Sequence, residues 1–405
     1  MQVPETSTPT QSAAESADLA RMRERLEELE AIHRPSASAG EREAAAWLVR
    51  CFAELGVEAR IEAEPAHGTY WWPLGIGAAA GALGGLAALR GKRALGFALG
   101  AAGAAAIADD FPPAQRRLRK LLPQRETYNV VAELGPSDAE RTVVLVAHHD
   151  AAHSGLVFHP ALPQLADRLG IIEGNDTSPP LMAPVVGGPV LTALGALTGS
   201  RLLTKLGILL GVGSAAAMAD IGSRQTVPGA NDNATAVVLL LEIARRLLHE
   251  PTASTRVMLL STGAEESFSE GMKAFGERHF PDLPTETTFF LCVDTLGSPH
   301  LNVLRGEGFL KMHEYPQRAL DLIDGLAEEL GIWLYPNLRL HNGTDGLEAL
   351  AAGYPTVALC SCTDLKQPAN YHWPSDVSGN VSFETLSDAV RLSEAVVRRL
   401  DERWL

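Results

Sequence analysis

The chain has 405 residues, of which 46% are apolar and 20% are charged, and its formal net charge is −15. This composition is typical of a globular protein large enough for one large domain or two ordinary ones. The acidic balance argues against a nucleic-acid partner, because nucleic-acid binding depends on clustered lysine and arginine. The four cysteines are too few for a disulfide framework and lack the paired spacing of a zinc ribbon.

The start of the chain predicts a disordered tail over residues 1–17. These residues are mostly small and polar, and they contain neither the basic nor the apolar region of a cleavable signal peptide. Apolar residues then recur at helical spacing and predict helices over about 18–32 and 40–55, followed by a short strand over 56–61. We therefore expect a folded domain over residues 18–405.

Two apolar blocks interrupt this domain, at about 70–110 and 177–220. Each block is typical of two helices that are joined by a basic tip. The tip of the first block is Arg90–Arg93, and Arg201 and Lys205 form the tip of the second. We expect two apolar helical hairpins of similar design.

The lengths of the four apolar segments bear on membrane contact. Trp71–Leu89 and Thr177–Ser200 reach the roughly 20 residues that a membrane span needs, whereas Ala94–Ala108 and Leu206–Ala219 are shorter. Their small residues suit close helix packing in lipid. We expect a membrane-associated protein; the alternative is a helical bundle that packs within a soluble protein or on a second subunit.

The rest of the chain alternates between strands and helices. Strands are predicted at 128–134, 142–147, 256–261, 288–294, 301–305 and 356–360, and helices at about 233–249, 268–278, 315–330 and 382–402. This order predicts an α/β fold, a three-layer α/β/α sandwich with a mixed, mostly parallel central sheet. In such sheets, reactive groups gather beyond the carboxyl ends of the strands.

Acidic and histidine residues stand at these strand ends. His148-His149-Asp150 ends one strand, Glu265-Glu266 follows another and Asp294 ends a third, while Asp232 opens a helix and His372 lies in a loop. Each alone has a structural explanation, such as a helix cap for Asp232. Together, these carboxylates would repel one another without a cation. Nitrogen and oxygen ligands without a thiolate suit zinc, for which manganese or cobalt can substitute.

These motifs resemble those of the co-catalytic di-zinc aminopeptidases, family twenty-eight of the metallopeptidases. The matching segments are Ala147–Asp150, Pro228–Ala234, Gly263–Glu266, Val293-Asp294 and Tyr371-His372. The resemblance extends from about Leu26 to the C-terminus without the two apolar blocks, which therefore look like insertions into a zinc peptidase domain.

The resemblance implies a set of metal ligands for two Zn²⁺ ions per chain. His148 and Asp294 would hold one zinc, Glu266 and His372 would hold the other, and Asp232 would bridge both ions.

The resemblance also implies roles beside the metal. Glu265 would be the general base, and Asp150 would orient the ring of His148. The peptide bond between Asp232 and Asn233 is expected to be cis. His153, His159 and His341 stay unassigned.

The implied activity is that of an aminopeptidase. Such an enzyme hydrolyses the N-terminal peptide bond of a substrate with a free amino terminus, through a metal-bridging water with Glu265 as general base. Two alternatives share the fold. A single-zinc acyltransferase of the glutaminyl-cyclase kind is disfavoured by the full set of five ligands, and a non-catalytic receptor or scaffold domain would have lost some of them.

Overall fold

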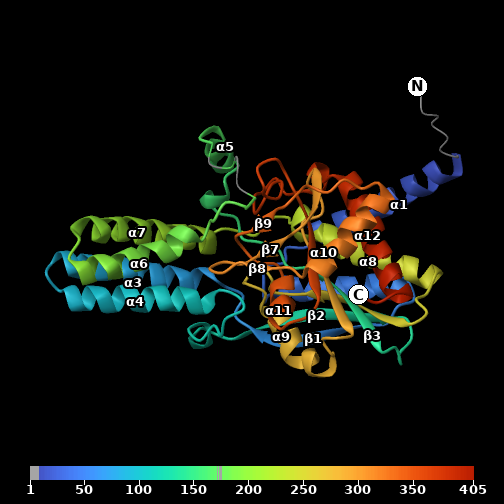
Figure 1. Ribbon diagram of the computed structural model, residues 1–405, viewed down its shortest axis with the longest axis horizontal. Helices are drawn as coiled ribbons and strands as arrows, with labels where there is room; N and C mark the ends of the chain where they lie inside the picture. The colour runs from blue at the N-terminus through green and yellow to red at the C-terminus, as the bar shows by residue number, and fades with distance from the viewer. Residues whose placement is uncertain (1–8, 171, 173–175) are drawn as a thin grey trace.

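The computed structural model describes residues 9–170, 172 and 176–405. Within these residues, seven strands form a central sheet of order β1-β2-β4-β3-β5-β10-β6 (Figure 1). The strands are β1 (Ala59–Ala66), β2 (Arg125–Leu134), β3 (Arg141–His148), β4 (Thr255–Thr262), β5 (Thr288–Val293), β6 (His300–Val303) and β10 (Thr356–Cys362). The central strands β4, β3, β5 and β10 pair in parallel, and the pairings toward both edges are antiparallel. The predicted mixed, mostly parallel sheet is confirmed.

Helices cover both faces of the sheet. One layer consists of α1 (Pro9–Glu30), α2 (Ala39–Glu54), α8 (Thr235–His249), α10 (Gln317–Leu330) and α12 (Phe383–Glu402), and the other of α9 (Glu270–His279) and α11 (Gly346–Ala351). Successive strand residues point to opposite faces. In β5, for example, Phe289 packs into the first layer and Phe290 into the second. The three-layer α/β/α arrangement follows from this alternation.

The shorter elements lie around the sheet. Within the same part of the chain, β7 (Gly306–Glu307), β8 (His313–Glu314) and β9 (Arg339–Leu340) form a small second sheet. The helix α5 (Ala161–Arg168) and the helix α11 are additions to the predicted elements. Helix α1 begins at Pro9, earlier than the expected residue 18, and the first eight residues of the predicted tail lie outside the described residues.

Four helices of the described chain form a bundle that projects from the α/β part (Figure 1). They are α3 (Trp71–Leu89), α4 (Arg93–Asp110), α6 (Ala183–Thr198) and α7 (Arg201–Ser223), and we call them the apolar bundle. Helices α3 and α4 pack on each other, as do α6 and α7, and the two pairs pack together. Both apolar blocks therefore contribute to a single helical unit.

The lengths of the last two bundle helices differ from the prediction. The segment Thr177–Ser200 was expected to supply a long helix, but α6 has only 16 residues, whereas α7 has 23. Helix α6 ends at Gly199, which adopts the left-handed conformation (φ 77°) that is common beyond a helix end. Ser200 then caps α7, because its hydroxyl accepts a hydrogen bond from the amide of Leu203. By length and composition, α3 and α7 are the two described helices that suffice to cross a membrane.

Glycines fill the interior of the apolar bundle. A Cβ atom on Gly100 would lie 2.7 Å from the amide nitrogen of Ala193, and one on Gly207 would lie 2.6 Å from that of Thr192. The outer surface instead carries large side chains: Leu202 of α7 is 68% exposed and Leu209 is 67% exposed. The bundle thus has glycines at its closest helix contacts and leucines on its outer surface, while Leu74 and Ile107 are completely buried.

Candidate metal centre

A tight turn leads from α7 to Asp232. Gly229 adopts a left-handed conformation (φ 66°), and a Cβ atom there would lie 2.6 Å from the carbonyl oxygen of Asp232. The buried guanidinium of Arg34 donates hydrogen bonds to the carbonyl oxygens of Pro228 (2.6 Å) and Gly229 (2.7 Å). The peptide bond between Asp232 and Asn233, at the end of this turn, is cis, as the sequence resemblance implied. Arg34 therefore fixes the start of the turn through two main-chain carbonyl groups.

The carboxylate of Asp376 also holds this turn. It accepts hydrogen bonds from the amides of Asn231 (2.8 Å) and Asp232 (3.1 Å). Sequence analysis assigned no role to Asp376, although it lies only four residues beyond His372. Its partners are more than 140 residues away in sequence, so no local pattern indicates the contact.

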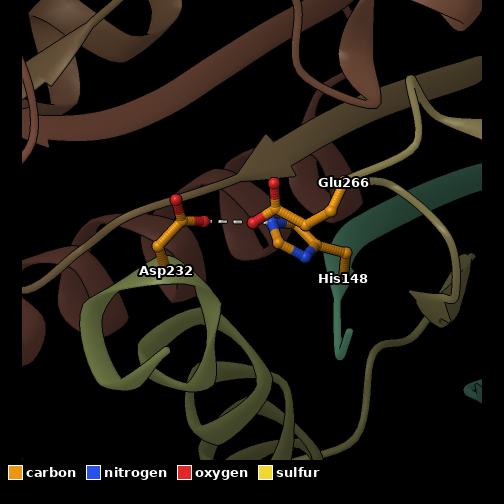
Figure 2. Close-up of side chains that lie close together, drawn as sticks. All are labelled: His148, Asp232 and Glu266. Atoms are coloured by element: carbon orange, nitrogen blue, oxygen red, sulfur yellow. Dashed lines mark ion pairs between the residues drawn. The ribbon is translucent and has the colours of Figure 1, made fainter. Parts of the chain in front are cut away.

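The carboxylate of Asp232 lies between two histidines. Its Oδ1 is 3.4 Å from Nε2 of His148, and its Oδ2 is 3.2 Å from Nε2 of His372. Among the described residues no side chain caps the start of α8, so Asp232 is not the helix cap that its position also allowed. Figure 2 shows the side chains of His148, Asp232 and Glu266 converging on one point.

Further carboxylates lie beside each histidine. Oε2 of Glu266 lies 3.2 Å from Nε2 of His372. Nε2 of His148 lies 3.9 Å from Oε2 of Glu265 and 4.0 Å from Oδ1 of Asp294. His148 ends β3, Asp294 follows β5 and Glu266 follows β4. The carboxyl ends of neighbouring parallel strands therefore bring together residues that are distant in sequence.

Asp150 connects His148 to the loop that carries the two glutamates. Its Oδ1 lies 3.4 Å from Nδ1 of His148. The same carboxylate accepts hydrogen bonds from the amides of Glu265 and Glu266, both at 3.1 Å, and from the hydroxyl of Ser36 at 2.6 Å. A buried carboxylate with these partners fixes both the imidazole ring and the start of the glutamate loop.

The electrostatics of the site suit a bound cation. Burial and the neighbouring carboxylates raise the pKa of Glu265 and of Asp294 well above their usual values. Burial opposes ionisation of Asp232 too, but its hydrogen bonds with His148 and His372 hold its pKa below the ordinary value. A bound cation stabilises the ionised form of clustered buried carboxylates of this kind.

Unpaired atoms point to the same conclusion. Oε1 of Glu266 and Nδ1 of His372 are buried without a hydrogen-bond partner in the described part of the chain. One ligand atom from each of His148, Asp232 and Glu266 lies within 4.8 Å of the others. Imidazole nitrogens and carboxylate oxygens are suitable zinc ligands, so the residues present fit this metal.

The other histidines lie outside this cluster. His149 is buried and contacts the hydroxyl of Ser261 (2.9 Å), and Nδ1 of His153 lies 2.6 Å from the carbonyl oxygen of Arg224. The ring of His159 packs against Trp373. His341 is the one of these four that lines the cavity in front of the carboxylates.

That cavity has a volume of about 110 Å³ and opens beside the metal ligands. Its other walls are largely apolar and include Phe158, Leu181 and Met182, with Tyr70 at the start of α3. The ring centroid of Phe158 lies 4.5 Å from that of His372. The base of the apolar bundle therefore forms part of the wall of this cavity.

The model of peptidase family M28 matches residues 216–397. This match confirms the family resemblance. The matched region contains Asp232, Glu265, Glu266, Asp294 and His372, whereas His148 and Asp150 precede it. No curated protein matches the chain in sequence.

Solved structures of aminopeptidases and glutaminyl cyclases share the fold over nearly the whole chain. An aminopeptidase from Aneurinibacillus sp. strain AM-1 is 14% identical with a TM-score of 0.57, covering 94% of this chain and 93% of its own. A zinc aminopeptidase from Bacillus subtilis is 15% identical with a TM-score of 0.53 and 94% coverage of both chains. The glutaminyl cyclase of Bacteroides thetaiotaomicron is 12% identical with a TM-score of 0.55, covering 98% and 99%. At these identities the likeness shows the fold.

Proposed function

We propose that the protein is a zinc aminopeptidase, an exopeptidase that releases the first residue of a peptide with a free amino terminus. The observation that carries this proposal is the position of Asp232, which presents one carboxylate oxygen to His148 and the other to His372. With Asp294 beside the first histidine and Glu266 beside the second, the site offers two ligand sets that share one carboxylate. The match to the M28 peptidases supports the same activity.

His148 and Asp294 would hold one zinc ion, Glu266 and His372 would hold the other, and Asp232 would bridge them. When bound, such a metal pair acidifies a water molecule and polarises the carbonyl group of the scissile bond.

Side chains of the protein carry out the proton transfers of the reaction. Glu265 accepts the proton of the attacking water at its carboxylate and then delivers it to the nitrogen of the leaving amine. Asp150 keeps the ring of His148 and the amides of Glu265 and Glu266 in place during this transfer.

The charge of the cavity supports action at a chain end. The free amino group of a substrate would find negative charge at Glu265 or Asp294, which both line the cavity.

The variant Glu265→Gln tests the catalytic role. We expect it to retain its zinc and to lose activity on aminoacyl-nitroanilides by a factor of about 10² to 10⁴, because it keeps the shape of the side chain without its basicity. Glu277→Gln is the matched control, since Glu277 is an exposed glutamate on α9. Full activity of Glu265→Gln would exclude this residue as the base.

The products distinguish the alternatives within the fold. An aminopeptidase releases an amino acid from a peptide that begins with glutamine, whereas a glutaminyl cyclase releases ammonia and leaves the peptide intact. Zinc content adds a second criterion: about two ions per chain accord with the bridging site. One ion would favour the acyltransferase, and a protein without zinc affinity would favour a non-catalytic domain.

The apolar bundle provides a membrane anchor in the same proposal. Helix α3 with 19 residues and α7 with 23 would span roughly 29 and 35 Å at 1.5 Å per residue, which brackets the hydrocarbon thickness of a bilayer. Leucines on the outer surface would contact lipid, and interior glycines would allow the close packing on which helix association in lipid depends.

A further inference from the structure

The loop that follows β4 carries Glu265 and Glu266 in an unusual backbone conformation. Three of its non-glycine residues have positive φ angles: Ala264 (50°), Phe268 (70°) and Ser269 (53°). Such conformations are unfavourable for residues with a Cβ atom and persist only where surrounding contacts hold them. The contacts of this loop therefore decide where the two glutamates lie.

Two buried carboxylates, those of Asp150 and Glu41, hold the first half of the loop. Asp150 accepts hydrogen bonds from the amides of Glu265 and Glu266. Glu41, a fully buried residue of α2, accepts one from the amide of Ala264 at 3.0 Å. The second half, Ser267 to Ser269, has hydrogen bonds within the loop, such as those from the amide of Ser269 to the carbonyl oxygen of Glu265 (2.7 Å) and from the hydroxyl of Ser267 to that of Ala264 (3.1 Å). Further contacts come from another part of the molecule.

Arg119 fixes that second half. It lies in a single helical turn (η1, Arg119–Leu121) that follows α4, and its side chain is only 1% exposed. One guanidinium nitrogen, Nη1, donates a hydrogen bond to the carbonyl oxygen of Ser267 and lies 3.3 Å from Oε2 of Glu270. Nε and Nη2 donate to the two carboxylate oxygens of Asp110 at 2.9 and 2.7 Å. Asp110 is the last residue of α4.

The other end of the α3–α4 hairpin reaches the same point. Glu270, the first residue of α9, accepts hydrogen bonds from the amides of His67 (3.1 Å) and Gly68 (2.8 Å), which lie just before α3. It also accepts one from the hydroxyl of Ser267 at 2.7 Å. Both ends of the hairpin therefore bind the segment that follows the two glutamates.

Aromatic rings strengthen this junction. The ring of Phe268 stacks on Tyr70 with a centroid distance of 4.7 Å and meets the edge of Phe111 at 5.8 Å. Tyr70 directly precedes α3, and Phe111 directly follows α4. The loop residue with the largest positive φ thus inserts between the two ends of the hairpin.

We propose that Arg119 is a positioning residue that sets the place of Glu265 and Glu266 by joining their loop to the α3–α4 hairpin of the apolar bundle. The proposal rests on the proposed function of those two glutamates. A guanidinium suits the task because its rigid fork serves the carboxylate of Asp110 and the carbonyl of Ser267 at once. Lysine has the same charge but one nitrogen, so it retains only part of this connection.

The test compares Arg119→Lys with Arg117→Lys in the zinc-loaded, full-length protein. Arg117 pairs with Asp109 in the same segment but is 73% exposed, which makes it a matched control. In Arg119→Lys we expect amide hydrogen exchange in the peptide 263–270 to become about tenfold faster, because one charge-assisted hydrogen bond is lost. We also expect kcat to fall by about 100-fold with little change in KM, since misplaced catalytic groups slow the chemical step. Arg117→Lys should change neither quantity.

Unchanged exchange and unchanged kcat in Arg119→Lys would overturn the proposal, as would equal effects in Arg117→Lys. If Arg119→Lys does not fold, Asp110→Asn serves instead, because it keeps the shape of the hairpin end while removing its charge. Faster exchange in the peptide 263–270 of that variant supports the link to the bundle, and unchanged exchange contradicts it. A wild-type protein that binds zinc but cleaves no aminoacyl substrate would contradict the proposed function, and the exchange comparison would still decide the role of Arg119.

Discussion

The α/β part and the apolar bundle differ in the position of their large apolar side chains. The α/β part buries such side chains, whereas the apolar bundle exposes leucines on its outer surface. In the α/β part Phe52 and Phe289 are completely buried, and the exposed surface is rich in charge. In the bundle the closest helix contacts are made at glycines, and leucines such as Leu209 face outward. Burial of apolar surface drives packing in water, whereas close contact of small residues drives it in lipid. The difference accords with the proposed role of the apolar bundle as a membrane anchor.

The largest expected effect concerns the metal ligands of the α/β part and leaves the apolar bundle unchanged. Asp232→Ala should lower the zinc content from about two ions per chain to none, because a carboxylate that bridges both ions belongs to both ligand sets. The measurement is elemental analysis after purification. The apolar bundle should be unaffected, so the variant should fractionate as the wild type does. Retention of full zinc content would contradict the bridging role.

A smaller effect concerns the interior of the bundle. In Gly207→Leu the new side chain would start 2.6 Å from the amide nitrogen of Thr192 and 2.8 Å from the carbonyl oxygen of Gly188. We expect the free energy of unfolding to fall by about 1–3 kcal/mol, as is usual for overpacking. Thermal unfolding in detergent measures the change. Gly213→Leu in the same helix is the control, since a Cβ atom there meets nothing within 4 Å. Equal destabilisation in both variants would refute the close packing at Gly207.

The smallest effect concerns the outer surface of the bundle. Leu209→Ala should change the free energy of unfolding in detergent by less than about 0.5 kcal/mol, because the side chain is exposed. Like the wild type, this variant should stay in the membrane fraction after a carbonate wash. Recovery of the wild type and of Leu209→Ala in the soluble fraction would contradict the membrane association of the apolar bundle. A change of subunit number in the variant, detected by light scattering, would instead indicate a second protein subunit on this surface.

The sequence predicted the layered α/β fold because strand and helix periodicities differ clearly in their apolar residues. It did not predict the lengths of α6 and α7 correctly, since an uncharged run need not be a single helix. The signals that divide the helices, Gly199 and Ser200, lie inside that run. Local cap chemistry was therefore a better guide to these boundaries than the distribution of charge.

At the site, the residues named by the motifs lie together, but those that support them were not identified. Asp376 and Arg119 act on main-chain groups in distant segments, and Glu41 resembles an ordinary acidic residue in the first turn of a helix. Any residue type exposes the same amides and carbonyls, so a contact to the main chain leaves no sequence pattern. Only the fold shows which carboxylate or guanidinium reaches which loop.

The arrangement of the apolar bundle has one more consequence. The chain passes between the bundle and the α/β part four times, before α3, after α4, before α6 and after α7. A protein tethered by one terminal helix is shed when a protease makes a single cut in its stalk. Here one cut at any of the four passages leaves three covalent connections, and a nick at Gly91 or Gly199, between paired helices, leaves all four. A single proteolytic cut therefore cannot release the α/β part from the apolar bundle.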